Sequence, residues 1–291
     1  MVIRDSACCF NVSEASRTKT KVCWFLGDQC NLSCKHCSVC AETTASRVPS
    51  TPAEEALVRK TVKELKQRFP TEDLGIILSG GEPLLYELAI TVANSASHTG
   101  ISVSLATNGI LLKQRANEFI DNGVEKFIVS LDSAEPTIHN ALRNNNNAHH
   151  AAVEGIKAVK TLGKKVGTCA YIFDENIGKL AEIIRFNSDL GISQVSLSFP
   201  MVLGREIAEN SNLARIVIRD ASGSKEIIEN AKEKLAGMNL NIEVVFSVPF
   251  CAKERVRKQA DNTYIMKRCP HSGRKVHSIE KDIIKECIYA N

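Results

Sequence analysis

Short apolar runs alternate with amphipathic segments over roughly the first two thirds of the chain. Apolar runs of strand length predict buried strands, and segments whose apolar residues recur at helical spacing predict helices. Residues 50–69, for example, place Val58, Val62 and Leu65 along one helical face. The strands predicted in this way are 22–26, 74–78, 102–106, 126–131, 165–173 and 194–199, and the helices are 50–69, 84–97, 112–121, 148–162 and 177–189.

This alternation predicts six βα units with parallel strand pairing, because parallel neighbours need a helical crossover. Six units are too few for a closed barrel, so the pattern indicates a partial (β/α)6, TIM-like barrel or a doubly wound sheet, and we take the partial barrel as the α/β fold class. Either arrangement places a functional site at the carboxyl ends of the strands. After Pro200 the pattern weakens to a helix near 225–235 and a strand at 242–248. We therefore expect an N-terminal segment (1–20), a barrel (21–210) and a small C-terminal extension (211–291).

The composition is that of a globular protein, with 44% hydrophobic and 24% charged residues and a net charge of +4. These values exclude a disordered or collagen-like chain, and the surplus charge is too small to indicate a nucleic-acid or membrane partner. No apolar run is long enough to span a bilayer, and residues 1–21 lack the apolar core of a signal peptide. We therefore expect a cytoplasmic protein with no nucleic-acid and no membrane partner.

Cysteine is the unusual component, with eleven residues in the chain. Disulfides do not persist in a reducing cytosol, so clustered cysteines suggest a metal site. Cys30, Cys34 and Cys37 follow the first predicted strand in a C-x3-C-x2-C spacing, and three thiolates on so short a loop can converge on an iron–sulfur cluster or a zinc ion. Cys40 keeps a structural zinc loop open as the alternative, because it could supply a fourth ligand.

Polar motifs also stand at the ends of the next three predicted strands. Gly-Gly-Glu-Pro (80–83) follows the second strand, Thr-Asn-Gly (107–109) follows the third, and Ser-Leu-Asp (130–132) closes the fourth. Paired glycines let a ligand approach the backbone closely, and Glu82 offers a carboxylate to a cationic group, although an ordinary strand-to-helix turn has the same composition. In the Ser-Leu-Asp motif, Ser130 and Asp132 lie two apart on a predicted strand, so they would share one face.

These four motifs, in this order on these elements, make the chain resemble the radical S-adenosylmethionine superfamily over about residues 20–200. The resemblance implies an enzyme with a 4Fe–4S cluster held by Cys30, Cys34 and Cys37, and with S-adenosylmethionine on the open iron. The reduced cluster cleaves that cofactor to a 5′-deoxyadenosyl radical, which abstracts a substrate hydrogen atom. A flavodoxin- or ferredoxin-type protein would donate the electron.

The resemblance also assigns further residues to the cofactor. Gly80, Gly81 and Glu82 would receive the methionine ammonium, Ser130 and Asp132 the ribose, and Arg143 the carboxylate, while His36 would lie near the adenine and Asn108 would face the cofactor. Some of these residues have simpler alternatives. His36 and Arg143 could be solvated surface residues, and Asn108 could simply cap its turn.

Cys251, Cys269 and Cys287 recur near the C-terminus, where the run from 269 to 287 resembles the opening of SPASM and twitch extensions. Such extensions hold auxiliary 4Fe–4S clusters, so these three cysteines could hold a second cluster, with zinc or no metal as the alternative. Relatives that carry such extensions mostly modify ribosomally made peptides by crosslinking, epimerisation or oxidation. A peptide maturase is therefore the favoured function. A separate carrier protein could present the peptide to the enzyme.

Two other functions stay open at this point. The same radical chemistry could build a small molecule or cofactor, and a non-enzymatic iron–sulfur carrier or sensor would also explain clustered cysteines. Substrate contacts are not assigned by any motif. Polar residues near the fifth and sixth strands are candidates that could equally be packed or solvated, namely Tyr171, Asp174, Ser196 and Ser198.

Overall fold

In the computed structural model, a mostly parallel sheet is covered by helices. The structure describes residues 2–6, 20–37, 41–69, 74–173, 175–198, 230, 233–236, 240–247, 256–258, 264–266, 276–280 and 283–285. The statements below concern these residues.

Six parallel strands form the centre of the sheet, and each is hydrogen-bonded to the strand that precedes or follows it in this series. They are β2 (Thr20–Phe25), β5 (Leu74–Ser79), β6 (Ser102–Thr107), β7 (Val124–Ser130), β8 (Lys165–Tyr171) and β9 (Gln194–Ser198). A doubly wound sheet would reverse direction at one point in this order, whereas a barrel winds in one direction. The unreversed order therefore confirms the partial TIM-like barrel.

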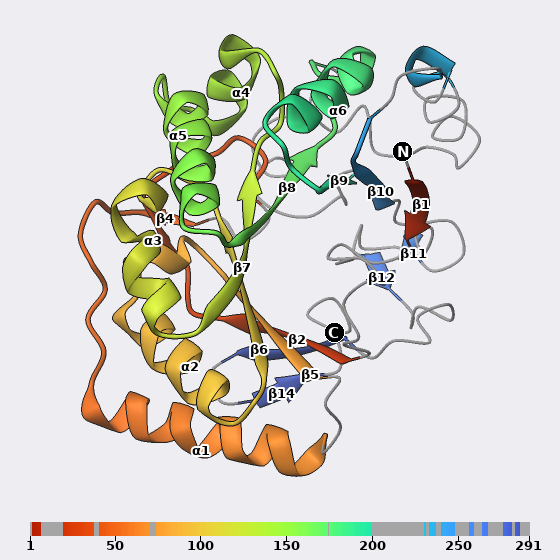
Figure 1. The fold of residues 1–291 in the computed structure, drawn as a ribbon. Helices are drawn as coiled ribbons and strands as arrows, with labels where there is room; N and C mark the ends of the chain where they lie inside the picture. Colours follow the sequence, from red (N-terminus) through yellow and green to blue (C-terminus); the bar gives the residue numbers. More distant parts are fainter. Residues whose placement is uncertain are drawn as a thin grey trace.

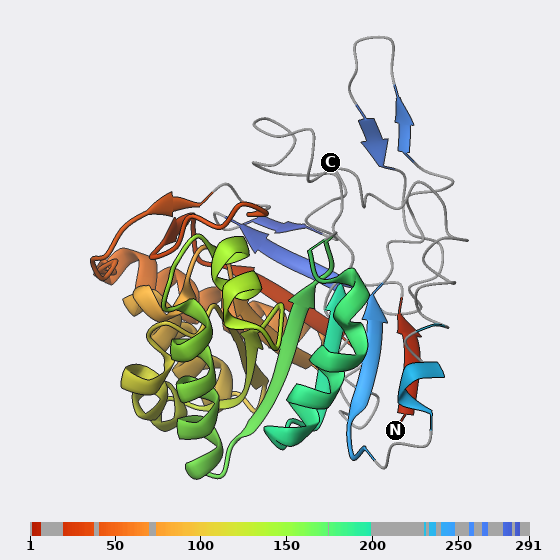
Figure 2. The same cartoon turned by 90° about the horizontal axis from the view of Figure 1, so that it is seen from above.

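Helices cover one side of this sheet, as Figures 1 and 2 show from two directions. They are α1 (Pro52–Arg68), η1 (Pro83–Leu85), α2 (Glu87–His98), α3 (Leu112–Asp121), α4 (Pro136–Arg143), α5 (Ala148–Thr161), η2 (Ile177–Lys179) and α6 (Leu180–Asp189). Helix α1 starts with a capping box, in which the Thr51 hydroxyl accepts from Glu54 N–H and the Glu54 carboxylate accepts from Thr51 N–H. No described helix is both long and apolar enough to cross a membrane.

The two sides of the sheet differ in composition because side chains alternate along each strand. On β6, Val103 and Leu105 are fully buried against the helices, while Ser102 and Ser104, which alternate with them, stay partly exposed on the other side. Strand β7 repeats the pattern, with buried Val129 flanked by partly exposed residues. One side is thus an apolar core, and the other carries serines at several positions together with Ile128 of β7.

Further strands extend both edges of the sheet. At one edge β10 (Glu243–Ser247) pairs parallel to β9, and β1 (Val2–Ser6) pairs parallel to β10. At the other edge β13 (Val276–Glu280) pairs parallel to β2, and β14 (Ile283–Lys285) pairs antiparallel to β13. A separate antiparallel pair consists of β11 (Val256–Lys258) and β12 (Tyr264–Met266). Segments 1–20 and 211–291 both contribute strands to the sheet, and the segment boundaries themselves stay a prediction.

Two of the differences from the expectation lie next to the strand ends that carry the motifs. Helix α4 lies in a stretch for which the sequence pattern predicts no helix, and Pro136 occupies its first turn. Strand β7 ends at Ser130 rather than at residue 131, although Leu131 N–H still donates to the Cys169 carbonyl at 2.9 Å. Most of the predicted helix near 225–235 lies outside the described residues.

Candidate active site

The cysteine loop begins directly after β2. Cys30 ends the short strand β3 (Gln29–Cys30), which pairs with β4 (Glu42–Thr43), and the loop between them carries Cys34 and Cys37. All three are free thiols, and Cys30 and Cys34 are buried around Leu32, which is 3% exposed. The loop is therefore packed by its own apolar side chains.

Hydrogen-bond donors point at each of the three sulfurs. Leu32 N–H donates to Cys30 Sγ (3.4 Å), Ala41 N–H donates to Cys37 Sγ (3.3 Å), and Arg143 Nη1 lies 4.0 Å from Cys34 Sγ. Such donors stabilise thiolate ligands and tune the clusters they bind. Burial raises the pKa of Cys30 to about 12, so the metal-free thiol keeps its proton until a metal displaces it.

This donor set fits an iron–sulfur cluster. Among the described residues, no three His, Cys, Asp or Glu side chains lie close enough to share one metal ion. A four-iron cluster does not require this, because each thiolate binds a different iron. Cys40, the fourth ligand of the zinc alternative, lies outside the described residues.

The Gly-Gly-Glu turn is hydrogen-bonded to the start of the cysteine loop. Gly81 N–H donates to the Gly27 carbonyl (2.7 Å), and Glu82 N–H donates to the Gln29 carbonyl (2.9 Å). A Cβ atom on Gly81 would lie 2.0 Å from the Gln29 oxygen, and Gly80 has a φ of +126°. The close approach that these glycines permit is thus made by the chain's own backbone. Their contact with a methionine ammonium stays a prediction.

Glu82 is buried and connects the ends of two strands. Its Oε1 accepts from Leu84 N–H (3.0 Å) and Thr107 Oγ1 (2.7 Å), and its Oε2 accepts from Asn108 N–H (2.8 Å). Burial raises the pKa of Glu82 to about 7 despite these bonds. A carboxylate can accept about four hydrogen bonds, so its second oxygen retains capacity for the predicted ammonium contact.

Asn108 caps its turn and also contacts the cysteine loop. Its Oδ1 accepts from Ile110 N–H (3.0 Å), which caps the turn. Its Nδ2 donates to Asn31 Oδ1 (2.7 Å) and lies 3.6 Å from Cys30 Sγ, so the side chain also faces the cysteine loop. A direct contact with the cofactor stays a prediction.

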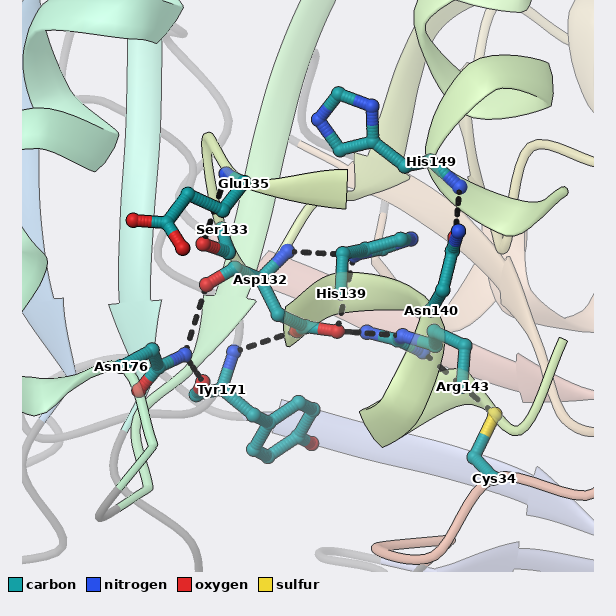
Figure 3. A network of polar contacts seen from close by, with 10 residues as sticks. All are labelled: Cys34, Asp132, Ser133, Glu135, His139, Asn140, Arg143, His149, Tyr171 and Asn176. Carbon is teal, nitrogen blue, oxygen red and sulfur yellow. Dashed lines mark hydrogen bonds and ion pairs between the residues drawn. The ribbon is translucent and has the colours of Figure 1, made fainter. Parts of the chain in front are cut away.

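Asp132 and Arg143 form a buried ion pair (Figure 3). Arg143 Nε donates to Asp132 Oδ2 at 2.6 Å, and Nη2 donates to Oδ1 at 2.8 Å. The arginine is 6% exposed, so the expectation of a solvated surface residue is wrong. Burial alone would raise the pKa of Asp132, but Arg143 and His139 outweigh it and hold this pKa well below its usual range.

Asp132 also lies differently from the sequence-based expectation. Because β7 ends at Ser130, Asp132 follows the strand, and the argument from a shared strand face does not apply to it. Its carboxylate instead accepts from Arg143 and from Tyr171 N–H (3.0 Å). Ser130 remains on the partly exposed side of the sheet. Contacts of Ser130 and Asp132 with a ribose stay predictions.

His36 is buried within an aromatic group. Its ring centroid lies 5.3 Å from that of Tyr171 and 5.0 Å from that of Phe173. The side chain is 8% exposed, so the solvent-facing alternative is wrong. Burial lowers its pKa to about 3, which keeps the ring neutral. Both ring nitrogens are buried with no hydrogen-bond partner among the described residues.

Sequence reasoning missed Asn176, which joins the ends of β7 and β8. Its Nδ2 donates to the carbonyls of Asp132 and Tyr171, both at 2.7 Å, and its Oδ1 accepts from Phe173 N–H (2.8 Å). It is completely buried. A polar residue just past a predicted strand end was the only sequence signal for it.

The other predicted residues divide between described and undescribed parts. Ser198 Oγ lies 3.7 Å from Cys169 Sγ, and Tyr171 contacts His36. Three cysteines and one acidic residue lie outside the described residues, namely Cys251, Cys269, Cys287 and Asp174.

A partial parallel barrel whose strand ends carry a three-cysteine loop and buried carboxylates is the architecture of an iron–sulfur enzyme. Residues 24–186 match the model of the Radical SAM superfamily. The chain belongs to this superfamily, and it is accordingly an enzyme that uses a 4Fe–4S cluster and S-adenosylmethionine.

Relatives and solved structures agree with this assignment. The chain is 32% identical over 190 residues to the pre-heme d1 synthase of Dinoroseobacter shibae, covering 64% of this chain and 45% of the synthase, so it spans about half that relative's length. It is 28% identical over 268 residues to the probable GTP 3′,8-cyclase of Sulfolobus acidocaldarius, covering 88% and 82% of the two chains. The structure of Streptococcus suis SuiB bound to S-adenosylmethionine superposes with a TM-score of 0.65 at 16% identity, covering 94% and 61%. At this identity the likeness shows a shared fold.

Proposed function

We propose that the protein uses radical S-adenosylmethionine chemistry to modify a polar small molecule in the biosynthesis of a cofactor. The observation that carries the choice of substrate is the side of the sheet that none of the described barrel helices covers. Its partly exposed positions include Ser102, Ser104 and Ser130. Hydroxyl groups on a sheet surface suit a substrate rich in hydrogen-bonding groups, because an apolar substrate would leave them unpaired.

Charged and amide groups continue this surface toward the amino ends of the strands. Lys126 Nζ donates to Gln194 Oε1 (2.8 Å), and Gln194 Nε2 donates to Glu243 Oε2 (3.0 Å). Among the described residues, the hydroxyl of Ser196 is buried with no hydrogen-bond partner. A buried hydroxyl in this position is costly unless a ligand or water satisfies it.

The relatives support the same choice. The probable GTP 3′,8-cyclase aligns with 88% of this chain. The pre-heme d1 synthase is 32% identical to it over the aligned residues. The names of both describe chemistry on small molecules. Peptide modification, which the C-terminal cysteines favour, has no comparable support, because the likeness to SuiB extends to the fold alone.

In this proposal Cys30, Cys34 and Cys37 hold the cluster. The cluster and S-adenosylmethionine, when bound, supply a 5′-deoxyadenosyl radical that abstracts a hydrogen atom from the substrate. Glu82 binds the methionine ammonium through Oε2, which accepts one protein hydrogen bond against two at Oε1. The buried His36 ring offers its neutral nitrogens to the adenine edge and excludes water from it. A flavodoxin- or ferredoxin-type protein supplies the electron.

The experiment is a coupled assay on the anaerobically reconstituted, chemically reduced protein. Formation of 5′-deoxyadenosine is measured alone and with GTP, with a tetrapyrrole and with a mixture of synthetic peptides. We expect a small polar molecule to increase the rate at least about tenfold, and deuterium from the labelled molecule to appear in 5′-deoxyadenosine. Stimulation by peptides alone would contradict the proposed substrate class. Absence of 5′-deoxyadenosine from protein with an intact cluster would contradict the proposed site.

A further inference from the structure

The guanidinium of Arg143 lies between a carboxylate and a cysteine sulfur. Nε and Nη2 donate to the two oxygens of Asp132, and Nη1 faces Cys34 Sγ at 4.0 Å (Figure 3). Two donors on one carboxylate fix the plane of the guanidinium, because a fork-to-fork pair tolerates little rotation. The direction of Nη1 is therefore set by Asp132.

Asp132 is itself held from several sides. Tyr171 N–H donates to its Oδ1 (3.0 Å), Asn176 Nδ2 donates to its carbonyl (2.7 Å), and its own N–H donates to His139 Nδ1 (3.0 Å). Asp132, His139 and Asn176 are completely buried. Asn176 and His139 thus fix the backbone of Asp132, and Tyr171 N–H holds its carboxylate beside Arg143.

A buried charge acts strongly on its neighbours because little water screens it. Reduction adds negative charge to a cluster, so a nearby cation favours the reduced state and a nearby anion opposes it. Arg143 presents its positive end to Cys34, while Asp132 lies on the opposite side of the guanidinium. The pair is therefore a fixed dipole directed at the sulfur.

We propose that the buried Asp132–Arg143 ion pair, whose guanidinium faces Cys34, sets the reduction potential of the cluster that Cys34 ligates through the net charge it places beside that sulfur. The inference rests on the cluster site proposed above. It gives Asp132 a role distinct from the predicted ribose contact, and it leaves Arg143 one N–H on each of Nη1 and Nη2 with which to reach a cofactor carboxylate.

The test is a redox titration of the reconstituted cluster, followed by electron paramagnetic resonance without S-adenosylmethionine. The variants are Arg143→Gln, Arg143→Lys and Asp132→Asn. Arg143→Gln should lower the potential because a cation is lost. Asp132→Asn should raise it because the cation is no longer neutralised. Arg143→Lys should fall between wild type and Arg143→Gln, because it keeps a charge but cannot hold the forked geometry.

Arg115→Gln is the matched control. Arg115 is 5% exposed and paired with Glu118 (2.8 Å), and among the described contacts it touches none of the three cysteines. Its loss should leave the potential unchanged. Iron content and circular dichroism identify any variant that fails to fold or load, and Arg143→Lys then carries the test in place of Arg143→Gln.

The outcomes separate the two proposals. Opposite shifts for Arg143→Gln and Asp132→Asn support the inference. Shifts of the same sign, or unchanged potentials in variants that carry about four irons, overturn it and leave the cluster site intact. A Cys30/Cys34/Cys37 triple alanine variant that keeps all of the wild-type iron and an unaltered spectrum overturns both.

Discussion

The Tyr86 hydroxyl accepts a hydrogen bond from the backbone N–H of Gln29 at 2.7 Å, although 57 residues separate the two in sequence. Tyr86 follows the Gly-Gly-Glu-Pro turn, and Gln29 precedes the first cysteine of the loop. The side chain of Tyr86 thus adds a third connection to the two backbone hydrogen bonds between these segments. The position of the thiols depends on the turn after the second barrel strand.

Replacing Tyr86 with Phe should loosen this connection. The substitution leaves the Gln29 N–H without its acceptor, and we expect a loss of about 1–2 kcal/mol in the free energy of unfolding, with reduced iron retention. Urea unfolding of the metal-free protein and iron analysis after gel filtration measure the two effects. Thr99→Val is the control, since it removes a hydroxyl that bonds only to the end of its own helix (2.8 Å to Ala96 O). Equal iron loss in both variants would contradict the prediction.

Gly81→Ala should be more damaging than its size suggests. The added methyl group would lie 2.0 Å from the Gln29 carbonyl oxygen, which is backbone and cannot rotate away. We expect a loss of at least about 2 kcal/mol in the free energy of unfolding. Gly178→Ala is the matched control, because a methyl group added there would meet no atom within 4 Å. Similar melting temperatures for the two variants would show that the turn and the loop are not in close contact.

Glu82 should make the stability of the metal-free protein depend on pH. Burial raises its pKa from 4.5 to about 7, so the folded chain binds this proton more tightly than the unfolded chain does. The free energy of unfolding should therefore fall as the pH rises from about 4.5 to about 7 and then level off, with a contribution of about 3 kcal/mol.

The variant that isolates this effect is Glu82→Gln. Its free energy of unfolding should be lower by an amount that does not depend on pH, because an amide NH2 would face the Asn108 N–H. The part of the free energy of unfolding that falls with rising pH in the wild type should be absent from the variant. Denaturant titrations of both proteins between about pH 4.5 and 8 measure the difference. An identical slope in wild type and variant would show that Glu82 does not carry the shifted proton.

The C-terminal cysteines can be tested through the iron content of a Cys30/Cys34/Cys37 triple alanine variant. If Cys251, Cys269 and Cys287 hold a second cluster, the anaerobically reconstituted variant should retain about four irons and their sulfide. Cys23→Ala, which removes a buried thiol on β2, should keep the full wild-type content. A triple variant without iron would contradict the second cluster.

The barrel was largely predictable because its strands are apolar runs and its helices are amphipathic. Helix α3 spans Leu112–Asp121, the range that the pattern indicates. Helix α4 was not predictable in this way because it has eight residues, too few for a repeating apolar face. Its omission matters, since α4 carries both His139 and Arg143 into the site.

The site was predictable as a set of residues but not as a set of contacts. Motifs at strand ends identified Glu82, Asp132 and the cysteines, because parallel strands bring their carboxyl ends together. The partners of these side chains come from elsewhere: Thr107 binds Glu82 across 25 residues, and Asn176 binds Asp132 across 44. Neither the periodicity nor the spacing along one strand contains such pairings.

The packing of the cysteine loop has a consequence for how the protein acquires and replaces its metal. Leu32 lies buried between Cys30 and Cys34, and Thr44 N–H and Lys35 N–H hold the loop through the Cys30 and Leu142 carbonyls at 2.7 and 3.1 Å. These contacts involve no metal. We therefore expect the loop to keep its thiols close together when oxygen destroys a cluster, so that a new cluster can be assembled by exchange of protons for iron without refolding of the whole domain.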